Sequence, residues 1–353
     1  MSKVLMCGNE AIAEAAIIAG CRFYAGYPIT PQNEIPSYMS KRMPEVGGVF
    51  IQSESEISAI NMVFGASVTG VRAMTSSSSP GISLKQEGIS YLAACELPAV
   101  IVNIMRGGPG LWNIAPSQSD YFQAVKGGGH GDYHTIVVAP ASLQEMVDLT
   151  FLAFDLADKY RTPVMILGDG ILGQMMAPVE FKNGEGWRVK GEGVKKDWIL
   201  DGCKDRKPRI IRSLLLADDE LEKLNLKLQK KYQDIKDKET RCEVLYGDDS
   251  EIMLVAYGTT SRIARSVVEK LRKTGKKIGM LRPMTLWPFP EKGLKKLAKK
   301  AKSFLVVEMS CGQMVEDVKL AIDCSRPVYF YGRTGGQIPD ESGITKEIER
   351  IYG

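Results

Sequence analysis

Short apolar runs alternate with longer helical stretches along the first half of the chain. The strand-like runs lie at residues 22–27, 49–52, 71–76, 99–105, 135–140 and 163–169, and the helical stretches at residues 9–20, 56–70, 82–96 and 142–160. The run "AVIVNIM" (99–105) is nearly all apolar, which is typical of a strand buried on both faces of a parallel sheet. The alternation predicts a doubly wound α/β domain over residues 1–180.

Residues 181–250 break this rhythm. The stretch "FKNGEGWRVKGEGVKKDW" (181–198) predicts loop and short irregular structure, and the highly charged residues 217–239 predict an exposed or domain-bridging helix. Strand-like runs and helical stretches resume at residue 251 and continue to residue 353. We therefore predict a second, smaller parallel-sheet domain over 251–353, joined to the first by an irregular and helical linker.

Composition and charge narrow the class of protein. The 353 residues are 44% hydrophobic and carry a formal charge of +4, with basic and acidic residues interleaved. The densest basic run (291–302) alternates lysine with leucine and alanine, which favours a solvated helix face over a nucleic-acid site. The seven cysteines include no CxxC pair, so neither a zinc site nor a local iron–sulfur site is expected. Without a signal peptide or membrane-length apolar run, a soluble cytoplasmic protein is expected.

The polar residues with most chemical potential follow predicted strands. They are Thr30, Glu54, Glu56, Ser76–Ser79, Arg106 and Asp169. Because ligands of open parallel sheets bind beyond the carboxyl ends of the strands, these residues are expected along one edge. Loop residues are polar in any case, so position alone does not specify a site.

Glu56 and Arg106 each have two interpretations. Glu56 opens a helix, where the dipole favours an acid, but the uncharged helix that follows indicates burial and a carboxylate facing a site. Arg106 precedes two glycines, which suits gripping a carboxylate or phosphate or pairing with a loop. "TSSSSPGISLKQEG" (75–88) fits a phosphate cradle or a capped turn. His130 and His134 lie among glycines, which disfavours a metal site.

Several familiar motifs are absent from the sequence. It contains no GxxxxGK[ST], no GxGxxG after a strand, no GxSxG and no HExxH. P-loop phosphoryl transfer, dinucleotide binding and nucleophile-elbow hydrolysis are therefore unsupported.

The motifs that are present resemble a known family. "GYPITPQNEIP", "SESEISAINMVFGAS", "TSSSSPGISLKQEG" and "IMRGGPG" occur in the order and at the separations seen in alpha subunits of 2-oxoacid:ferredoxin oxidoreductases. "PSQSDYFQAVKGGGHGDYH" and "LGDGILGQMM" extend the resemblance, which covers nearly the whole chain. Within this family the chain is most similar to the branched-chain type, which acts on 3-methyl-2-oxobutanoate.

The resemblance implies a thiamine-diphosphate enzyme that converts a 2-oxo acid and coenzyme A to acyl-CoA, carbon dioxide and reduced ferredoxin. It implies a pyrimidine-binding domain and a transketolase-C-terminal-like domain in this chain. A beta subunit is implied to hold the diphosphate and its Mg²⁺. A ferredoxin-like iron–sulfur subunit and a gamma subunit complete the implied assembly, with the clusters on partners. This chain is therefore expected to be inactive alone, to bind no metal and to contact neither nucleic acid nor membrane.

The resemblance also assigns roles to individual residues. Glu56 matches the carboxylate that hydrogen-bonds a ring nitrogen of the aminopyrimidine, Arg106 the grip on the substrate carboxylate, and Thr30 a hydroxyl beside substrate and cofactor. Further residues implied to contact the cofactor are Tyr27, Pro28, Ile29, Ser77 and Ser78. Pro28 and Pro31 would hold the Thr30 loop stiffly, since each proline restricts its own φ and the preceding residue. Asp169, in a partial magnesium-binding motif, is interpreted as structural.

Three other interpretations stay open. The chain could serve a 2-oxoglutarate, pyruvate or indolepyruvate enzyme, because substrate preference cannot be separated by physical argument. It could be the beta-type subunit of a lipoyl-linked 2-oxoacid dehydrogenase, although the "YPITP" and "RGGPG" loops argue against this. It could also be a scaffold that only docks partner subunits.

Overall fold

Apolar runs form the centre of a seven-stranded sheet. The computed structural model describes residues 3–111, 113–181 and 196–352. Strands Ala73–Ser77 (β4), Ala99–Met105 (β5) and Pro163–Asp169 (β7) are buried along their whole length. The other strands are Phe23–Gly26 (β2), Val49–Gln52 (β3), Ile136–Val138 (β6) and Thr285–Trp287 (β12). In the order β12-β6-β7-β5-β4-β2-β3, every pairing is parallel except that of β12 with β6.

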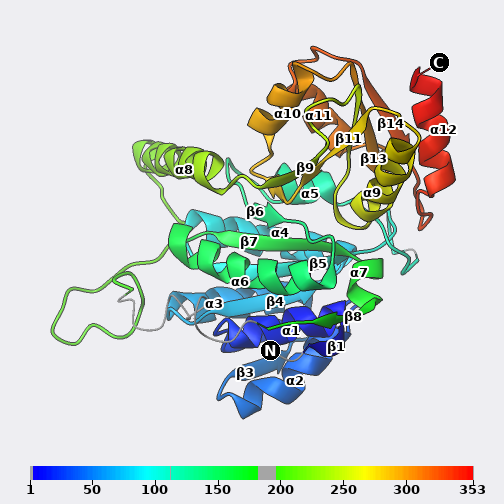
Figure 1. Cartoon of the computed structure of the whole chain (residues 1–353). Helices are drawn as coiled ribbons and strands as arrows, with labels where there is room; N and C mark the ends of the chain where they lie inside the picture. The colour runs from blue at the N-terminus through cyan, green and yellow to red at the C-terminus, as the bar shows by residue number, and fades with distance from the viewer. Residues whose placement is uncertain (1–2, 112, 182–195, 353) are drawn as a thin grey trace.

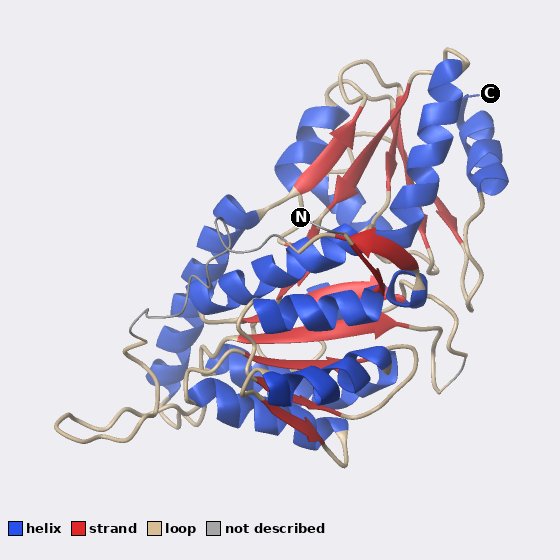
Figure 2. Cartoon of the chain, turned by 60° about the horizontal axis from the view of Figure 1, so that its bottom comes forward, coloured by secondary structure: helices blue, strands red, loops and turns tan. Residues whose placement is uncertain are grey.

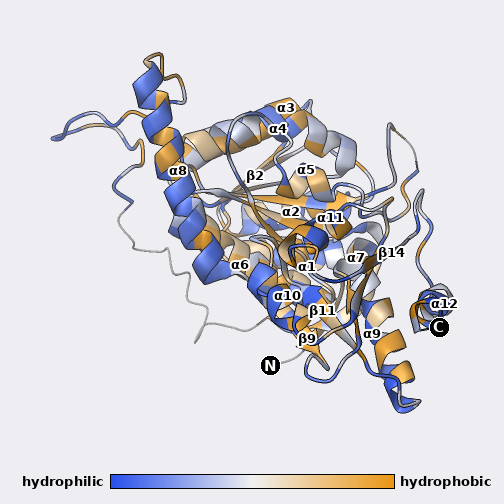
Figure 3. Cartoon of the chain, turned by 90° about the horizontal axis from the view of Figure 1, so that it is seen from above, coloured by the Kyte–Doolittle hydropathy of each residue, from blue (hydrophilic) through white to orange (hydrophobic). Residues whose placement is uncertain are grey.

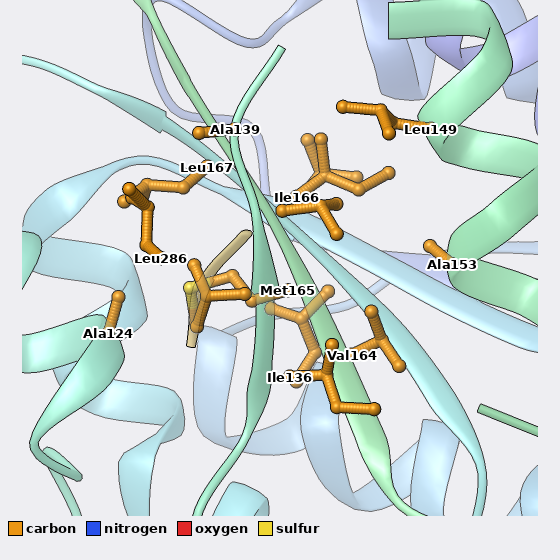
Figure 4. Close-up of a cluster of buried hydrophobic side chains, with 14 of the residues drawn as sticks. Ala124, Ile136, Ala139, Leu149, Ala153, Val164, Met165, Ile166, Leu167 and Leu286 are labelled. Atoms are coloured by element: carbon orange, nitrogen blue, oxygen red, sulfur yellow. The ribbon is translucent and has the colours of Figure 1, made fainter. Parts of the chain in front are cut away.

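Helices cover both faces of this sheet (Figures 1 and 2). One face packs against Gly8–Ile18 (α1), Glu34–Glu45 (α2) and Leu143–Tyr160 (α6), and the other against Glu56–Val68 (α3) and Ser79–Ala94 (α4) (Figure 3). Two helices are short: Tyr121–Val125 (α5) follows a loop after β5, and Gly170–Gln174 (α7) follows β7 directly. Strands Val4–Cys7 (β1) and Met176–Val179 (β8) form a separate antiparallel pair. Figure 4 shows the core around β7, where Met165, Ile166 and their neighbours are inaccessible to solvent or nearly so.

A second sheet lies beyond the first, at the top of Figure 1. Its strands are Val328–Gly332 (β14), Ser303–Glu308 (β13), Ile252–Val255 (β10), Ile278–Pro283 (β11) and Cys242–Leu245 (β9), in that order across the sheet. Strand β9 is antiparallel to β11 and the rest are parallel. Its helices are Gly258–Lys273 (α9), Glu291–Ala298 (α10), Met314–Ala321 (α11) and Glu341–Tyr352 (α12). The long helix Asp218–Glu239 (α8) runs beside the first sheet (Figure 1).

Buried polar contacts join the two sheets. The amide side chain of Gln118 donates to the carbonyl of Tyr257 at 2.8 Å, and its oxygen accepts from the amide of Met309 at 3.0 Å. Arg282, on β11, donates to both carboxylate oxygens of Glu145, on α6, at 2.7 and 2.8 Å. Gln118 is fully buried and its polar groups are paired, so separating the sheets would expose or orphan these groups.

The α/β fold with two doubly wound parallel sheets is confirmed. The structure adds elements that the hydropathy pattern did not predict: β1, α2, α5, α7, β8, β9, β12 and α12. Strand β12 belongs to the first sheet although it lies within residues 251–353, so the domain boundaries stay a prediction. Of the segment predicted to be irregular, residues 182–195 lie outside the described residues, and residues 196–217 form neither helix nor strand.

The described helices are too short or too polar to cross a membrane.

Candidate functional site

The strand order of the first sheet reverses direction at one position. From β2 the chain moves outward to β3 and then returns to the other side of β2 to form β4. Ligands of open α/β sheets bind at such a reversal, outside the carboxyl ends of the strands. The segments that follow β2, β4 and β5 carry Thr30, Ser78 and Arg106. The segment that follows β3 leads to Glu56, the first residue of α3.

Glu56 lies at the start of α3 with its side chain buried. Ser55 caps this helix by accepting a hydrogen bond from the amide of Ser58 at 3.2 Å, and Glu56 is only 5% exposed. A methyl group on Gly81 would lie 2.5 Å from Glu56 Oε1 and 2.1 Å from Ser77 Oγ. Both polar atoms therefore lie against the same glycine at the start of α4. Glu54, by contrast, is exposed.

Two serine hydroxyls between the end of β4 and the start of α4 have no partner among the described residues. They are Ser77 Oγ and Ser78 Oγ, and both side chains are fully buried. An unpaired buried hydroxyl costs roughly 1–3 kcal/mol, so natural structures leave few of them without a reason. The site thus offers a carboxylate and one unsatisfied hydroxyl against Gly81, with the second unsatisfied hydroxyl on the neighbouring Ser78.

Arg106 joins the loop after β2 to the loop after β5. Its Nη1 donates to the carbonyl of Thr30 at 2.8 Å and its Nη2 to the carbonyl of Leu111 at 3.0 Å. Arg106 is 7% exposed, and its Nε has no partner in the described part of the chain. The guanidinium therefore keeps one buried, unused N–H direction.

The loop after β2 is held by several polar contacts. Asn33 Nδ2 donates to the hydroxyl of Thr30 at 3.1 Å, and the fully buried Gln32 accepts from Ser76 and donates to the carbonyl of Tyr27 at 3.3 Å. Tyr27 and Pro28 are exposed, while Ile29 and Thr30 are half-buried. The hydroxyl of Thr30 accepts from Asn33, so its own proton stays available for a ligand.

The contacts of Asp169 fit its structural interpretation. It caps α7 by accepting from the amides of Ile171 and Leu172 at 3.0 and 3.2 Å, and it accepts from the hydroxyl of Thr259 at 2.9 Å. Burial raises the pKa of this carboxyl. Its hydrogen bonds tie the end of β7 to the start of α9, and no group of His, Cys, Asp and Glu in the described residues could hold a metal ion.

His134 packs as an aromatic side chain. Its ring stacks on Trp287 with centroids 4.6 Å apart and meets the edge of Tyr232 at 5.3 Å. Burial, with smaller contributions from Lys236 and Lys126, lowers the pKa of His134 to about 4. His130 lies in an exposed loop beside Tyr91.

We expect the neutral ring of His134 to make folding stability depend on pH. The folded pKa lies below the usual value of 6.5, so its contribution is present above pH 6.5 and is lost as pH falls towards 4. The loss amounts to roughly 2–3 kcal/mol. Thermal unfolding of the assembled enzyme should therefore show a smaller acid-induced fall in Tm for His134→Phe than for the wild type. His130→Phe is the control, and equal falls in all three proteins would contradict the expectation.

Gly81→Ala should disturb the site through a single methyl group. The methyl would displace Ser77 and Glu56, and overpacking of this kind costs roughly 1–3 kcal/mol. We expect a lower Tm and weaker binding of thiamine diphosphate, measured by titration of the assembled enzyme. Gly293→Ala is the matched control, since a methyl there meets its nearest atoms at 3.5 Å. Unchanged affinity for thiamine diphosphate in Gly81→Ala would show that the contact of Gly81 with Ser77 and Glu56 has no part in cofactor binding.

Sequence reasoning missed three polar residues of this region, Asn103, Asp120 and Lys85. Asn103 donates to Asp120 at 3.0 Å and accepts from the amide of Ser79, whose hydroxyl donates to Asp120. Asn103, Asp120 and Ser79 therefore form one network under the loop that carries Arg106. Lys85 is fully buried on α4. Asn103 could have been found from the sequence, because an amide inside an otherwise apolar strand is unusual. Lys85 could not, because its burial depends on which face of α4 is covered.

Comparison with known proteins assigns both halves of the chain to one enzyme family. Residues 14–211 match the family model "Pyruvate flavodoxin/ferredoxin oxidoreductase, thiamine diP-bdg", and residues 250–344 match "Pyruvate:ferredoxin oxidoreductase core domain II". The first match identifies a thiamine diphosphate-binding domain, and it contains Thr30, Glu56, Ser77 and Arg106.

Relatives of similar length are subunits of such enzymes. The chain is 50% identical to ketoisovalerate oxidoreductase subunit VorB of Methanothermobacter marburgensis, covering 100% of this chain and 99% of that protein. It is 40% identical to 2-oxoglutarate synthase subunit KorA of Archaeoglobus fulgidus, covering 94% and 95%.

Solved structures agree with this grouping. The 2-oxoglutarate:ferredoxin oxidoreductase from Magnetococcus marinus, solved with 2-oxoglutarate, coenzyme A and succinyl-CoA bound, matches with a TM-score of 0.87 at 26% identity, covering all of this chain and 66% of that one. A split-gene transketolase matches at 13% identity with a TM-score of 0.61, which indicates the shared fold alone. The chain belongs to the 2-oxoacid:ferredoxin oxidoreductase family, as one subunit of a multi-subunit oxidoreductase.

Proposed function

We propose that this chain supplies the aminopyrimidine-binding half of the thiamine diphosphate site and the grip on the substrate carboxylate. The reaction is the oxidative decarboxylation of 3-methyl-2-oxobutanoate with coenzyme A to acyl-CoA, carbon dioxide and reduced ferredoxin. The observation that carries the proposal is the buried Glu56 beside Gly81, with unpaired Ser77 and Ser78 hydroxyls at the reversal of strand order. The substrate follows from the relative that shares half of all residues and acts on ketoisovalerate.

The residues present fit thiamine diphosphate. The cofactor, when bound, supplies the carbon nucleophile and electron sink that decarboxylation of a 2-oxo acid requires. Glu56 is a buried acceptor suited to sharing a proton with a ring nitrogen, because exclusion of water strengthens such a bond. The unpaired hydroxyls of Ser77 and Ser78 would gain partners, and the lack of a side chain on Gly81 lets Glu56 and Ser77 lie directly against α4. Tyr27, Pro28 and Ile29 would line the other side of the ring.

Arg106 and Thr30 are proposed to bind the 2-oxo acid. The unpaired Nε of Arg106, with a remaining N–H of its fork, would hold the carboxylate through charge-assisted hydrogen bonds. The hydroxyl of Thr30 can donate towards the oxo group, since Asn33 occupies its acceptor side. Fixing both groups before substrate arrives lowers the entropic cost of orientation.

The remaining parts of the enzyme are assigned to partners. We propose that a beta subunit holds the diphosphate and its Mg²⁺, and that a ferredoxin-like subunit carries the iron–sulfur clusters, with a gamma subunit completing the assembly. In support, the exposed positions of α3 are uncharged, and Ile57 on α3 and Leu84 on α4 are 50% and 51% exposed beside the site. Exposed apolar side chains on both helices suit burial against another subunit.

The proposal is tested by anaerobic reduction of a viologen dye. The chain, purified with its partner subunits, is supplied with coenzyme A, thiamine diphosphate and one 2-oxo acid at a time. We expect reduction with 3-methyl-2-oxobutanoate and none without thiamine diphosphate. Faster reduction with 2-oxoglutarate, pyruvate or indolepyruvate would replace the substrate and keep the reaction. Failure with every acid in a complex that holds its clusters and cofactor would favour a lipoyl-linked enzyme, tested with lipoamide, or a docking role alone.

A further inference from the structure

Lys85 is a fully buried lysine next to the proposed catalytic carboxylate. Its side chain is inaccessible to solvent, and its Nζ donates to the main-chain oxygen of Glu56 at 3.4 Å. Lysine is almost never fully buried unless its charge is compensated, because removing an ammonium from water is costly. The family comparison and the proposed function give this residue no role.

The geometry of α4 explains how Lys85 reaches Glu56. Gly81, Lys85 and Gly88 are separated by four and three residues, so they share one face of the helix. A methyl group on Gly81 would lie 2.5 Å from the carboxylate of Glu56, and one on Gly88 would lie 2.5 Å from Ile60. The face that carries Lys85 is thus packed on the first turns of α3, and the two helices run together in Figure 3. The ammonium lies on the backbone side of Glu56.

Glu56 is the charged residue that faces Lys85, because the other acidic residues nearby are bonded elsewhere. Helix α3 carries no other charged residue, and strands β4 and β5 carry none. Around α4, Asp120 is bonded to Ser79 and Asn103, Asp169 at the end of β7 is bonded to Thr259, and Glu87 accepts from Tyr91 on the exposed side. Burial lowers the pKa of Lys85 to about 8, while Glu56 acts in the opposite direction. The side chain therefore stays mostly protonated at pH 7.

We propose that Lys85 is a positioning residue that keeps a positive charge beside Glu56 and thereby sets how strongly this carboxylate binds a proton. The inference rests on the proposed role of Glu56 towards thiamine diphosphate. A nearby cation favours the ionised carboxylate, which is the form that accepts a hydrogen bond from a protonated ring nitrogen. Without the cation, the buried carboxylate of Glu56 would have no opposite charge beside it.

The test follows exchange of the cofactor's C2 proton with deuterated water. It uses the assembled enzyme with bound thiamine diphosphate, without any 2-oxo acid, over a range of pH. Lys85→Met removes the charge, so it should move the midpoint of the pH profile of the exchange rate upward by roughly 1–3 units, the usual effect of one neighbouring charge. Lys85→Arg should keep the wild-type midpoint. The same midpoint in Lys85→Met as in the wild type would overturn the inference.

A half-buried lysine in an ion pair provides the control. Lys231, on α8, is paired with Glu96 at 3.2 Å and belongs to another part of the fold. Lys231→Met removes a paired, largely shielded charge, and we expect it to lower Tm without moving the midpoint. A midpoint that shifts equally in Lys231→Met would show a general effect of destabilisation and would also overturn the inference.

The double variant Glu56→Gln/Lys85→Met covers the case in which Lys85→Met does not assemble. Removing one partner of a buried pair leaves an uncompensated charge, whereas removing both does not. We expect the double variant to assemble with a Tm no lower than that of Glu56→Gln; further loss of stability would contradict the coupling. If Glu56→Gln itself leaves exchange unchanged, the proposed function fails. If Glu56→Gln stops exchange and Lys85→Met has no effect, only the role of Lys85 fails.

Discussion

Glu56→Gln should slow turnover of the assembled enzyme by roughly 10²–10⁴-fold, the usual scale for a lost acid–base group. Glutamine has nearly the same shape, so the packing against Gly81 and the cap by Ser55 are kept. What disappears is the carboxylate that can share a proton with a ring nitrogen. We therefore expect a large loss in kcat for viologen reduction, and a lower Tm as well, because the buried Lys85 loses its charged neighbour.

Glu54→Gln is the control for this variant. Glu54 precedes the same helix by two residues and carries the same charge, but it is exposed. Turnover in Glu54→Gln should stay close to that of the wild type. Near-normal turnover in Glu56→Gln, or an equal loss in both variants, would remove Glu56 from the proposed role.

Arg106→Lys should raise the KM for the 2-oxo acid roughly tenfold to hundredfold, the equivalent of one hydrogen bond to a charged group. Lysine keeps the positive charge but lacks Nε and the planar fork, so it cannot hold the two loop carbonyls and the substrate carboxylate together. Arg106→Ala should raise KM further and also lower Tm, because the carbonyls of Thr30 and Leu111 lose their donor. Initial rates of viologen reduction at varied substrate concentration measure both.

Arg72→Lys is the control that distinguishes weaker substrate binding from a general loss of stability. Arg72 is 9% exposed and pairs with Asp155 and Asp158 at 2.9 and 2.8 Å, at a position outside the candidate site. We expect this variant to lower Tm and to leave KM as it is. An unchanged KM in Arg106→Lys, with full occupancy of thiamine diphosphate, would refute the assignment of Arg106.

Buried strands were the elements that hydropathy predicted best. Strand Ala99–Met105 coincides with the predicted run because a strand covered on both faces needs apolar residues at every position. Helix Glu34–Glu45 was not predicted, and it contains two prolines, which disfavour a helix interior. They lie in the first and last turns, where the helix tolerates them better than in its middle. Helix Glu341–Tyr352 did leave a signal, since Ile344 and Ile348 are four residues apart and both buried.

Strand Thr285–Trp287 could not be predicted from its own residues. Three residues carry no usable period, and they form a strand because the free edge of β6 is available beside them. The same limit applies to Lys85. Its helical position was predicted, but its burial depends on which face of α4 meets α3, and nothing in the local sequence determines that packing.

By itself, the sequence determined the α/β class, the family and the positions of Thr30, Glu56 and Arg106 after strands. These follow from local properties: strand and helix periods, and motifs whose residues are close along the chain. Tertiary structure alone decided that the chain reverses around β2, that Arg106 holds the Thr30 loop, and that Lys85 lies under Glu56. These depend on strand order and helix packing, which bring together residues 29 to 76 positions apart, and no local pattern encodes such contacts.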